Sequence, residues 1–388
     1  MIKSISILFL ITIISCSKKV SNQNIEIELD KLYQNQFPSN KPGGSILIKK
    51  GDDIIFLNGY GLADLVTKEK ITENTIFNTG SISKTFVANG ILILQERDSL
   101  SLNDNLYKYF DDFENIEISK KVKIKHLLSH TSGLPDNRNI IENRDFYITA
   151  KDKENFEPLK RVTKLNFEPG EKFQYSNPSF NGLALIIEEI TNEPWQKYVI
   201  NNVFKPAKMY NSKITNGAYP ETGVAHAYDN YYKDGDSIYF GDYYEYDYGE
   251  IPTFAAAGNG GVWSSILDLA KYEKAIEENL FLTKEMVRES RTVFYPKNWS
   301  DSIKPNVGYS WFIGEKNLFT KPNLFDVKFI HHTGSQGGFR SFYIKIPEKE
   351  ILFIGLFNRH VDNAEKLIYD SLKAIEKNNW LEKSKEFK

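Results

Sequence analysis

Three short motifs along the chain carry residues suited to acyl transfer at a serine. They are Ser81-Ile82-Ser83-Lys84, Tyr175-Ser176-Asn177 and His332-Thr333-Gly334. A serine hydroxyl is a poor nucleophile at neutral pH, so it needs a base within hydrogen-bond reach, a group that passes a proton to the leaving group, and donors for the developing oxyanion. Together the motifs supply these groups, and they predict a site that forms an acyl-enzyme.

The pattern Ser-x-x-Lys is common and occurs twice here, so its surroundings decide between the copies. The copy at Ser15 lies inside an apparent targeting segment, whereas Ser81 follows Gly80 and opens an apolar run at residues 86–94 with helical character. Lys84 then lies one turn later on the same helix face. The helix end adds free backbone N–H groups and a positive dipole for an oxyanion. Ser81 is therefore the predicted nucleophile.

Two residues compete for the role of base. Lys84 can accept the serine proton if burial and neighbouring cations depress its pKa. Tyr175 is the second candidate, because a phenol near two cations can ionise and later protonate the leaving group. The sequence does not choose between them. Asn177 carries an amide that can donate to a substrate carbonyl and accept a hydrogen bond from Lys84.

Further motifs extend this pattern over roughly residues 30–375. They include Ser129-His130-Thr131-Ser132-Gly133, Phe167-Glu168-Pro169-Gly170, Gly258-Asn259-Gly260-Gly261 and Gly334-Ser335-Gln336-Gly337-Gly338. In this order the chain resembles the serine β-lactamases and penicillin-binding D,D-peptidases, specifically the class C-like branch with its esterases and D-amino-acid peptidases. The resemblance implies an α+β, β-lactamase/transpeptidase-like fold. Its antiparallel five-stranded sheet is flanked by helices and carries an inserted, mostly helical lobe, with the catalytic cleft between sheet and lobe.

The resemblance also implies roles for the third motif. It places His332, Thr333 and Gly334 beside the substrate, and it assigns the oxyanion hole to the backbone N–H groups of Ser81 and Ser335. Efficient class C-like β-lactamases usually carry Lys-Thr-Gly here, whereas His-x-Gly is more typical of D,D-peptidases, D-amino-acid peptidases and esterases. The histidine therefore favours a D,D-peptidase or esterase over an efficient β-lactamase.

Charge at this motif is the main open question. A histidine has a reference pKa of about 6.5 and is mostly neutral at pH 7, whereas a lysine is a permanent cation. If His332 binds a substrate carboxylate, its protonated form would do so. Arg340, six residues after Gly334, is a candidate replacement for the missing cation, and an exposed arginine without that role is the alternative.

The N-terminus predicts export. A single Lys3 precedes an almost unbroken apolar stretch at residues 5–14, and Cys16 follows. A lone cysteine behind such a stretch resembles a bacterial lipoprotein processing site, although Ile13 stands where leucine is favoured. The alternatives are an ordinary signal peptide and an unprocessed membrane anchor. We expect a signal at 1–16, a polar tether at 17–25 and one two-lobed hydrolase domain at 26–380, lipid-anchored at Cys16 on the periplasmic side of a membrane.

Composition and motifs limit the classes of binding partner that the chain is expected to have. Lysine and arginine total 49 against 51 aspartates and glutamates, so no basic field favours nucleic acid. His126 and His130 have the i, i+4 spacing of a helical metal site, but no third ligand is indicated, so no metal is expected. The chain has no phosphate-binding glycine loop ahead of a matching helix, so no nucleotide cofactor is expected. The expected partner is a small molecule or peptide, and the oligomeric state is not predicted.

Periodicity places the main elements. We expect a helix near residues 27–36, strands at 44–50, 53–60, 329–332, 339–346 and 351–357, and a closing helix at 362–377. Both ends of the mature chain would thus build one sheet. The tyrosine-rich tract at 228–248 either walls the cleft or forms an exposed insertion.

Two function classes follow. The first is an exported serine hydrolase acting through an acyl-enzyme on Ser81, with D-amino-acid peptides of the cell wall, esters or β-lactams as substrates. The second is a catalytically silent lipoprotein that binds or senses peptidoglycan or β-lactams. Intact Ser81, Lys84, Tyr175 and Asn177 favour the first.

Overall fold

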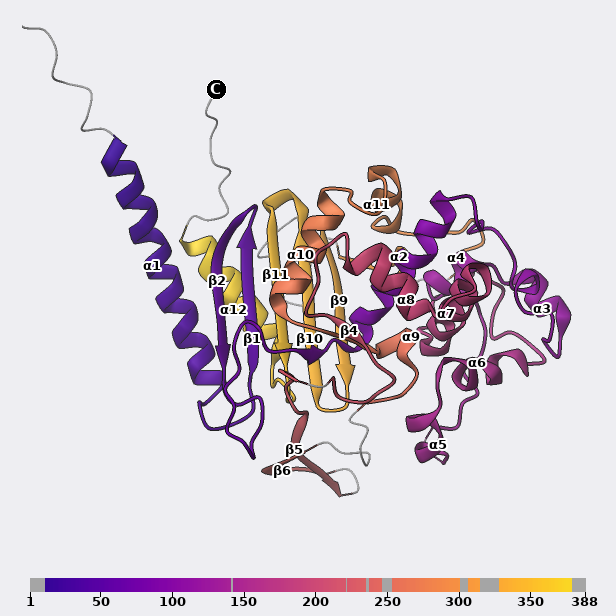
Figure 1. Cartoon of the computed structure of the whole chain (residues 1–388), viewed down its shortest axis with the longest axis horizontal. Coiled ribbons are helices and arrows are strands. Elements are labelled where there is room, and N and C mark those ends of the chain that lie inside the picture. The colour runs from indigo at the N-terminus through magenta and orange to yellow at the C-terminus, as the bar shows by residue number, and fades with distance from the viewer. Residues whose placement is uncertain are drawn as a thin grey trace, which may run out of the picture.

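The fold is built around one antiparallel sheet. The computed structural model describes residues 11–140, 142–220, 222–234, 237–245, 253–300, 306–314 and 328–378. Within these ranges the main sheet has six strands in the order β2-β1-β11-β10-β9-β8. They are β1 (Gly44–Lys50), β2 (Asp53–Tyr60), β8 (Phe312–Gly314), β9 (Phe329–Gln336), β10 (Phe339–Ile346) and β11 (Ile351–Phe357). Both ends of the chain build the sheet, as predicted (Figure 1).

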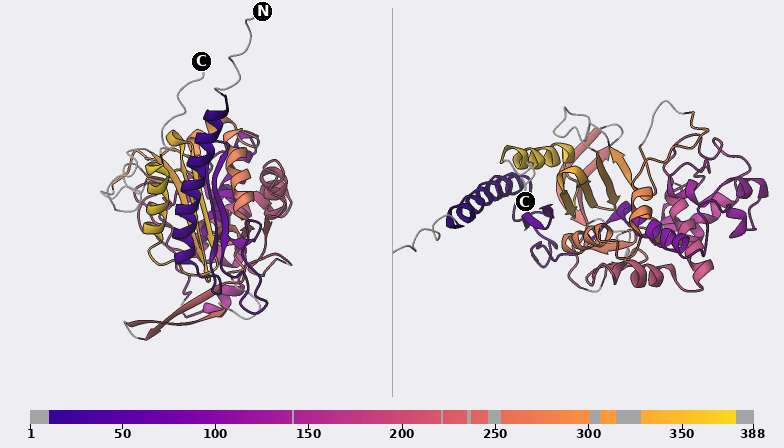
Figure 2. Two further views of the ribbon diagram at one scale, coloured as in Figure 1. Left: turned by 90° about the vertical axis from the view of Figure 1, so that its left-hand side faces the viewer. Right: turned by 90° about the horizontal axis from the view of Figure 1, so that it is seen from above.

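Alternating side chains give the sheet two apolar faces. Ile46 and Ile48 face one buried cluster and Leu47 faces the other, because successive residues of a strand point to opposite sides. The helices α1 (Ile11–Gln36) and α12 (Ala364–Lys377) cover the first face. The helix α10 (Ile266–Glu277) and the helical lobe cover the second (Figure 2). The sheet is thus the middle of three layers.

The helical lobe lies between β2 and β8 in sequence, as expected. Its elements are η1 (Gly80–Ile82), α2 (Ser83–Glu96), η2 (Leu106–Lys108), α3 (Ile116–Lys121), α4 (Ile124–Leu128), α5 (Arg144–Thr149), α6 (Asp152–Lys160), α7 (Asn177–Thr191), α8 (Trp195–Val199), η3 (Ile200–Phe204), α9 (Ala257–Gly260) and α11 (Lys284–Ser290). A small sheet joins β3 (Phe77–Asn78), β7 (Val262–Ser264) and β4 (Lys213–Ile214).

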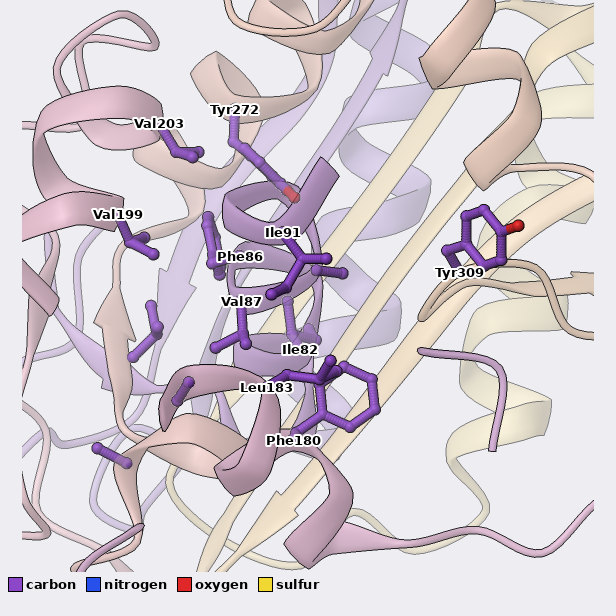
Figure 3. Packing of buried hydrophobic residues seen from close by; sticks show 14 of the residues in the cluster. Ile82, Phe86, Val87, Ile91, Phe180, Leu183, Val199, Val203, Tyr272 and Tyr309 are labelled. Carbon is purple, nitrogen blue, oxygen red and sulfur yellow. The ribbon is translucent and has the colours of Figure 1, made fainter. Parts of the chain in front are cut away.

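The helix α2 is the central rod of this lobe. Every residue from Ser83 to Leu94 is buried, and Figure 3 shows Phe86, Val87 and Ile91 of this helix in the cluster that also contains Leu183 of α7. A helix that is buried all round is covered by neighbouring elements on every side. The residues that begin α2 are therefore held rigidly.

The tyrosine-rich tract forms a hairpin of β5 (Tyr228–Asp234) and β6 (Ser237–Glu245), and residues 246–248 of the tract lie outside the described ranges. The hairpin projects from the body of the molecule (Figure 2). Tyr239 and Phe240 are exposed on it. Of the two interpretations from the sequence, the exposed insertion fits the structure.

The N-terminal helix differs from the prediction in its length. It begins at Ile11 and runs through residues 17–25, which we expected to form a tether. Those nine positions contain neither glycine nor proline, so nothing in them ends a helix. Among the described residues no helix is long and apolar enough to cross a membrane. Residues 1–10 of the predicted signal lie outside the description.

A buried ion pair connects α10 to the main sheet. Arg291 donates two hydrogen bonds to the carboxylate of Glu273 on α10, at 2.8 and 2.7 Å. Tyr343 of β10 donates to the same carboxylate. Burial opposes ionisation of Glu273, but the Arg291 guanidinium holds the pKa of this carboxyl below its ordinary value.

Replacing Glu273 with Ala should therefore destabilise the protein strongly. The substitution leaves the Arg291 guanidinium buried without a counter-charge, for which we expect a loss of about 3–5 kcal/mol in the free energy of unfolding. Urea denaturation measures this loss. The control is Glu278→Ala, because Glu278 pairs with Lys274 at the surface and should cost at most about 1 kcal/mol. Equal losses in the two variants would contradict the assignment.

Candidate active site

Ser81 and Lys84 meet at the start of the central helix. Ser81 lies in η1 and is partly exposed, whereas Lys84, one turn on in α2, is fully buried. The Lys84 Nζ donates a hydrogen bond of 2.9 Å to the Ser81 Oγ. The geometry predicted from the i, i+3 spacing is therefore present, with a partly exposed Ser81 and a fully buried Lys84 beneath it.

The surroundings of Lys84 favour its neutral form. Its Nζ also donates to the backbone carbonyl of Asn259, at 2.8 Å. A hydroxyl and a carbonyl carry no net charge, so neither compensates an ammonium. Burial, reinforced by the positive charge of Arg138, holds the pKa of Lys84 well below its ordinary value. The condition that the sequence left open for Lys84 as a base is met.

Tyr175 lies on the other side of the nucleophile. Although 37% of Tyr175 is exposed, desolvation of its hydroxyl raises the pKa of this phenol to about 12, against the lowering effect of the neighbouring Ser81 side chain. The Lys84 Nζ lies 5.2 Å from the centre of the Tyr175 ring and 5.8 Å from that of Phe180. Tyr175 thus keeps its proton at neutral pH, which suits a proton donor better than an initial base.

His130 holds the tyrosine segment in place, a role that the sequence did not reveal. Its ring stacks on Tyr175 with 4.3 Å between ring centres. Its Nδ1 accepts a hydrogen bond from the N–H of Ser176 at 3.0 Å, and its carbonyl accepts one from the N–H of Gln174 at 2.8 Å. One side chain and its carbonyl therefore fix three consecutive residues. The only indication of this role in the sequence was that His130 belongs to the Ser-His-Thr-Ser-Gly motif.

The histidine pair considered as a metal site has other partners. The Nδ1 of His126 accepts a hydrogen bond from the N–H of Lys123 at 3.1 Å and so caps the start of α4. In the part of the chain that the structure describes, no group of three or more His, Cys, Asp or Glu residues could hold a metal ion.

Two glycines let the nucleophile approach the sheet. A Cβ on Gly334 would lie 2.1 Å from the carbonyl oxygen of Thr79, and one on Gly80, whose φ is +52°, would lie 2.8 Å from the nitrogen of Ser335. Side chains at either position would push η1 away from β9. The absence of side chains thus brings Ser81 next to Ser335, as the predicted oxyanion hole requires.

The strand β9 has an open edge beyond His331. β8 pairs with β9 only at Phe329–His331, so in the described residues no strand pairs with residues 332–336 on that side. Thr333 and Ser335 are exposed along this stretch, and Gly334 between them is buried. The edge therefore offers both side chains and backbone groups to a bound molecule.

His332 does not carry the charge that we considered for it. The side chain is buried, and its Nδ1 lies 2.7 Å from the carbonyl oxygen of Thr333, which makes Nδ1 the protonated nitrogen. Burial and the neighbouring Lys84 lower the pKa of His332 to about 3. At pH 7 it is a neutral residue beside the strand edge.

Arg340, the candidate replacement for the missing cation, contacts the turn at the end of β9. One of its terminal nitrogens donates to the carbonyls of Gly337 and Phe339, at 2.9 and 2.7 Å. The guanidinium is thus engaged with the turn between β9 and β10. The cation that does act on Lys84 is Arg138, which the sequence did not single out.

Asn177 occupies the first position of α7, next to the capping Ser176, whose Oγ accepts a hydrogen bond from the N–H of Ser179. The expected hydrogen bond from Lys84 to Asn177 is not formed, because the Asn259 carbonyl takes that donor. The half-buried Asn177 amide has no hydrogen-bond partner among the described residues. It is therefore available to a bound substrate.

Comparison with known proteins gives one family. A family model described as Beta-lactamase matches residues 30–374. Penicillin-binding protein 4* of Bacillus subtilis (strain 168) is 25% identical over 344 residues, which cover 88% of this chain and 73% of that protein. Protein flp of Staphylococcus aureus (strain N315) is 26% identical over 353 residues; the match covers 88% of this chain but only 64% of flp, less than two thirds of its length.

Solved structures agree with this result. The octameric penicillin-binding protein homologue from Pyrococcus abyssi has a TM-score of 0.71 and 25% identity, with 91% of this chain and 76% of that chain covered. The D-amino acid amidase from Ochrobactrum anthropi SV3 has a TM-score of 0.72 over 92% of this chain and 99% of that chain. Its identity is 18%, which shows a common fold.

The protonation states give a pH prediction for acylation of Ser81. The rate should rise with pH as Lys84 loses its proton, because only the neutral amine accepts one, and Tyr175 should cause no fall until pH approaches about 12. His332 should add no inflection between about pH 6 and 8, since its pKa is about 3. Stopped-flow rates with a neutral and a carboxylate-bearing ester test this.

The matched variant is Lys84→Ala, which should slow acylation by roughly 10²–10⁴-fold, the usual contribution of a general base. A rate that falls with rising pH for the carboxylate-bearing ester alone would restore the charged role for His332.

Proposed function

The chain belongs to the beta-lactamase family, and we propose that this serine hydrolase is exported and forms an acyl-enzyme at Ser81 with D-amino-acid peptides or esters. The observation that carries the proposal is the position of the Ser81 hydroxyl between the amine of Lys84 and the phenol of Tyr175. The amine can accept the proton of the serine, and the protonated phenol can donate a proton to the leaving group.

The reaction follows from these positions. The Ser81 Oγ attacks the substrate carbonyl while its proton passes to the Lys84 Nζ, and the backbone N–H groups of Ser81 and Ser335 stabilise the oxyanion. Collapse of the tetrahedral intermediate breaks the bond to the leaving group, which takes a proton from Tyr175. Lys84 returns a proton to the phenolate. Water then hydrolyses the ester on Ser81 and regenerates the hydroxyl.

Two observations support D-amino-acid peptides or esters over β-lactams as the main substrates. His332 is neutral where efficient class C-like β-lactamases carry a permanent cation, so this position offers no charge to a β-lactam carboxylate. The relatives include a penicillin-binding protein by name, and the structural neighbours include a D-amino acid amidase. Cell-wall stem peptides, which end in D-amino acids, are a substrate class that fits both of these similarities.

Covalent labelling tests the nucleophile. A fluorescent penicillin or a fluorophosphonate should mark the wild type and leave Ser81→Ala unmarked, because the label needs the Ser81 oxygen. Gel fluorescence and intact mass measure the adduct. Ser99→Ala, at an exposed serine, is the control and should label like the wild type. Failure of both probes on folded wild-type protein would favour the silent binding protein.

Relative turnover tests the substrate class. We expect a D-Ala-D-Ala peptide, an N-terminal D-amino-acid amide or a p-nitrophenyl ester to be hydrolysed faster than a chromogenic cephalosporin. A cephalosporin rate that exceeds the others by orders of magnitude would show that the protein is a β-lactamase.

Export and anchoring at Cys16 form the second part of the proposal. Its support is the apolar stretch at residues 5–14 before the sole cysteine of the chain. Two acyl chains on Cys16 would anchor the protein stably. The wild type should then partition into the detergent phase, and Cys16→Ser should remain in the aqueous phase, with Ser21→Ala behaving as the wild type. A wild-type protein that is fully aqueous and begins beyond residue 16 would show that lipidation is absent.

A further inference from the structure

A buried carboxylate lies behind the active site, and no ion pair forms with it in the part of the chain that the structure describes. Asp152, the first residue of α6, is 6% exposed. Among the described residues its carboxylate accepts hydrogen bonds from Asn181 Nδ2 at 2.7 Å, Gly258 N–H at 2.8 Å and Trp195 Nε1 at 2.9 Å. Burial raises the pKa of Asp152 to about 6, against the lowering effect of these donors, so it remains mostly ionised at pH 7.

Two of the three donors around Asp152, Asn181 and Gly258, connect it to the segment that contacts Lys84. The Oδ1 of Asn181 accepts a hydrogen bond of 3.0 Å from the side chain of Asn259. Asp152 therefore holds Gly258 through its backbone and holds Asn259 through Asn181. The carbonyl of Asn259 is the acceptor that lies 2.8 Å from the Lys84 Nζ.

This arrangement matters because α9, which carries both Gly258 and Asn259, is only four residues long. A helix of this length has few internal hydrogen bonds to fix its carbonyls. Hydrogen bonds to a charged acceptor are roughly twice as strong as neutral ones, so the ionised Asp152 is well suited to fix such a segment. The space is also tight, since a Cβ on Gly258 would lie 3.1 Å from the Asp152 Oδ1.

We propose that Asp152 is a positioning residue for the acylation step: through Asn181 and α9 it fixes the Asn259 carbonyl that orients the amine of Lys84 toward Ser81. The proposal rests on the proposed function, in which Lys84 is the base. A lysine amine has three rotatable positions for its hydrogen atoms and its lone pair. With one hydrogen directed to Asn259, the neutral amine can turn its lone pair to Ser81 in place of the N–H that donates there, so that the hydroxyl becomes the donor. Loss of the carboxylate should leave Ser81 intact but disorder its base.

The test compares two variants that disturb the same carboxylate in different places. Asp152→Asn removes the charge that fixes α9, whereas Trp195→Phe removes a donor that does not lead to Lys84. We expect Asp152→Asn to slow acylation of Ser81 by roughly 10–10²-fold on folded protein, with little change in KM. Trp195→Phe should stay within about threefold of the wild type, even if both variants lower the melting temperature.

A double-mutant cycle separates positioning from general destabilisation. In a Lys84→Ala background, Asp152→Asn should have no further effect on the residual acylation rate, because the base that it orients is gone. Should Asp152→Asn not fold, Asn181→Leu breaks the link to Asn259 while Asp152 keeps its two other donors, and it should give the same non-additive loss.

Additive losses in the cycle, or equal losses in Asp152→Asn and Trp195→Phe, would overturn the positioning role and leave Asp152 a purely structural residue. Wild-type protein that does not react at all would instead count against the proposed function, so the two failures are distinguishable.

Discussion

The exclusion of water and counter-charge from Lys84 is the constraint on which the site depends. An amine beside a serine is useful as a base only when it is neutral, and neutrality at pH 7 requires a lysine that is desolvated and has no carboxylate partner. The structure meets both conditions, because Lys84 is fully buried and its hydrogen bonds go to a hydroxyl and a carbonyl. The apolar core around α2 thus performs a chemical task as well as a structural one.

The groups that enclose Lys84 come from distant parts of the chain. The sheet is formed by both chain ends, and Gly80 and Gly334 let the nucleophile lie directly against it. His130 and the start of α7 bring in Tyr175, and α9 brings in the Asn259 carbonyl. Packing of the helical lobe on the sheet therefore assembles the site, and no single element contains it.

Local patterns predicted much of this structure, whereas long-range contacts were beyond them. The spacing of Ser81 and Lys84 is a helix property, and five of the six strands are apolar or alternating runs long enough to read from the sequence. β8 was missed, since three residues show no period. The Asn259 carbonyl lies 175 positions from Lys84 and has no side-chain signal. The sequence left the charge of His332 open, because burial sets its pKa and burial depends on the tertiary structure.

The aromatic rings around Lys84 also act on the lysine after it has taken a proton. A buried ammonium without a partner has a high free energy of desolvation, so apolar surroundings alone would strongly favour loss of the proton. The faces of Tyr175 and Phe180 carry partial negative charge at 5.2 and 5.8 Å from the amine. The same enclosure therefore tolerates the cation briefly. Burial favours the neutral amine in the resting enzyme. The two rings stabilise the ammonium form during the interval between removal of the proton from the serine and its transfer onward.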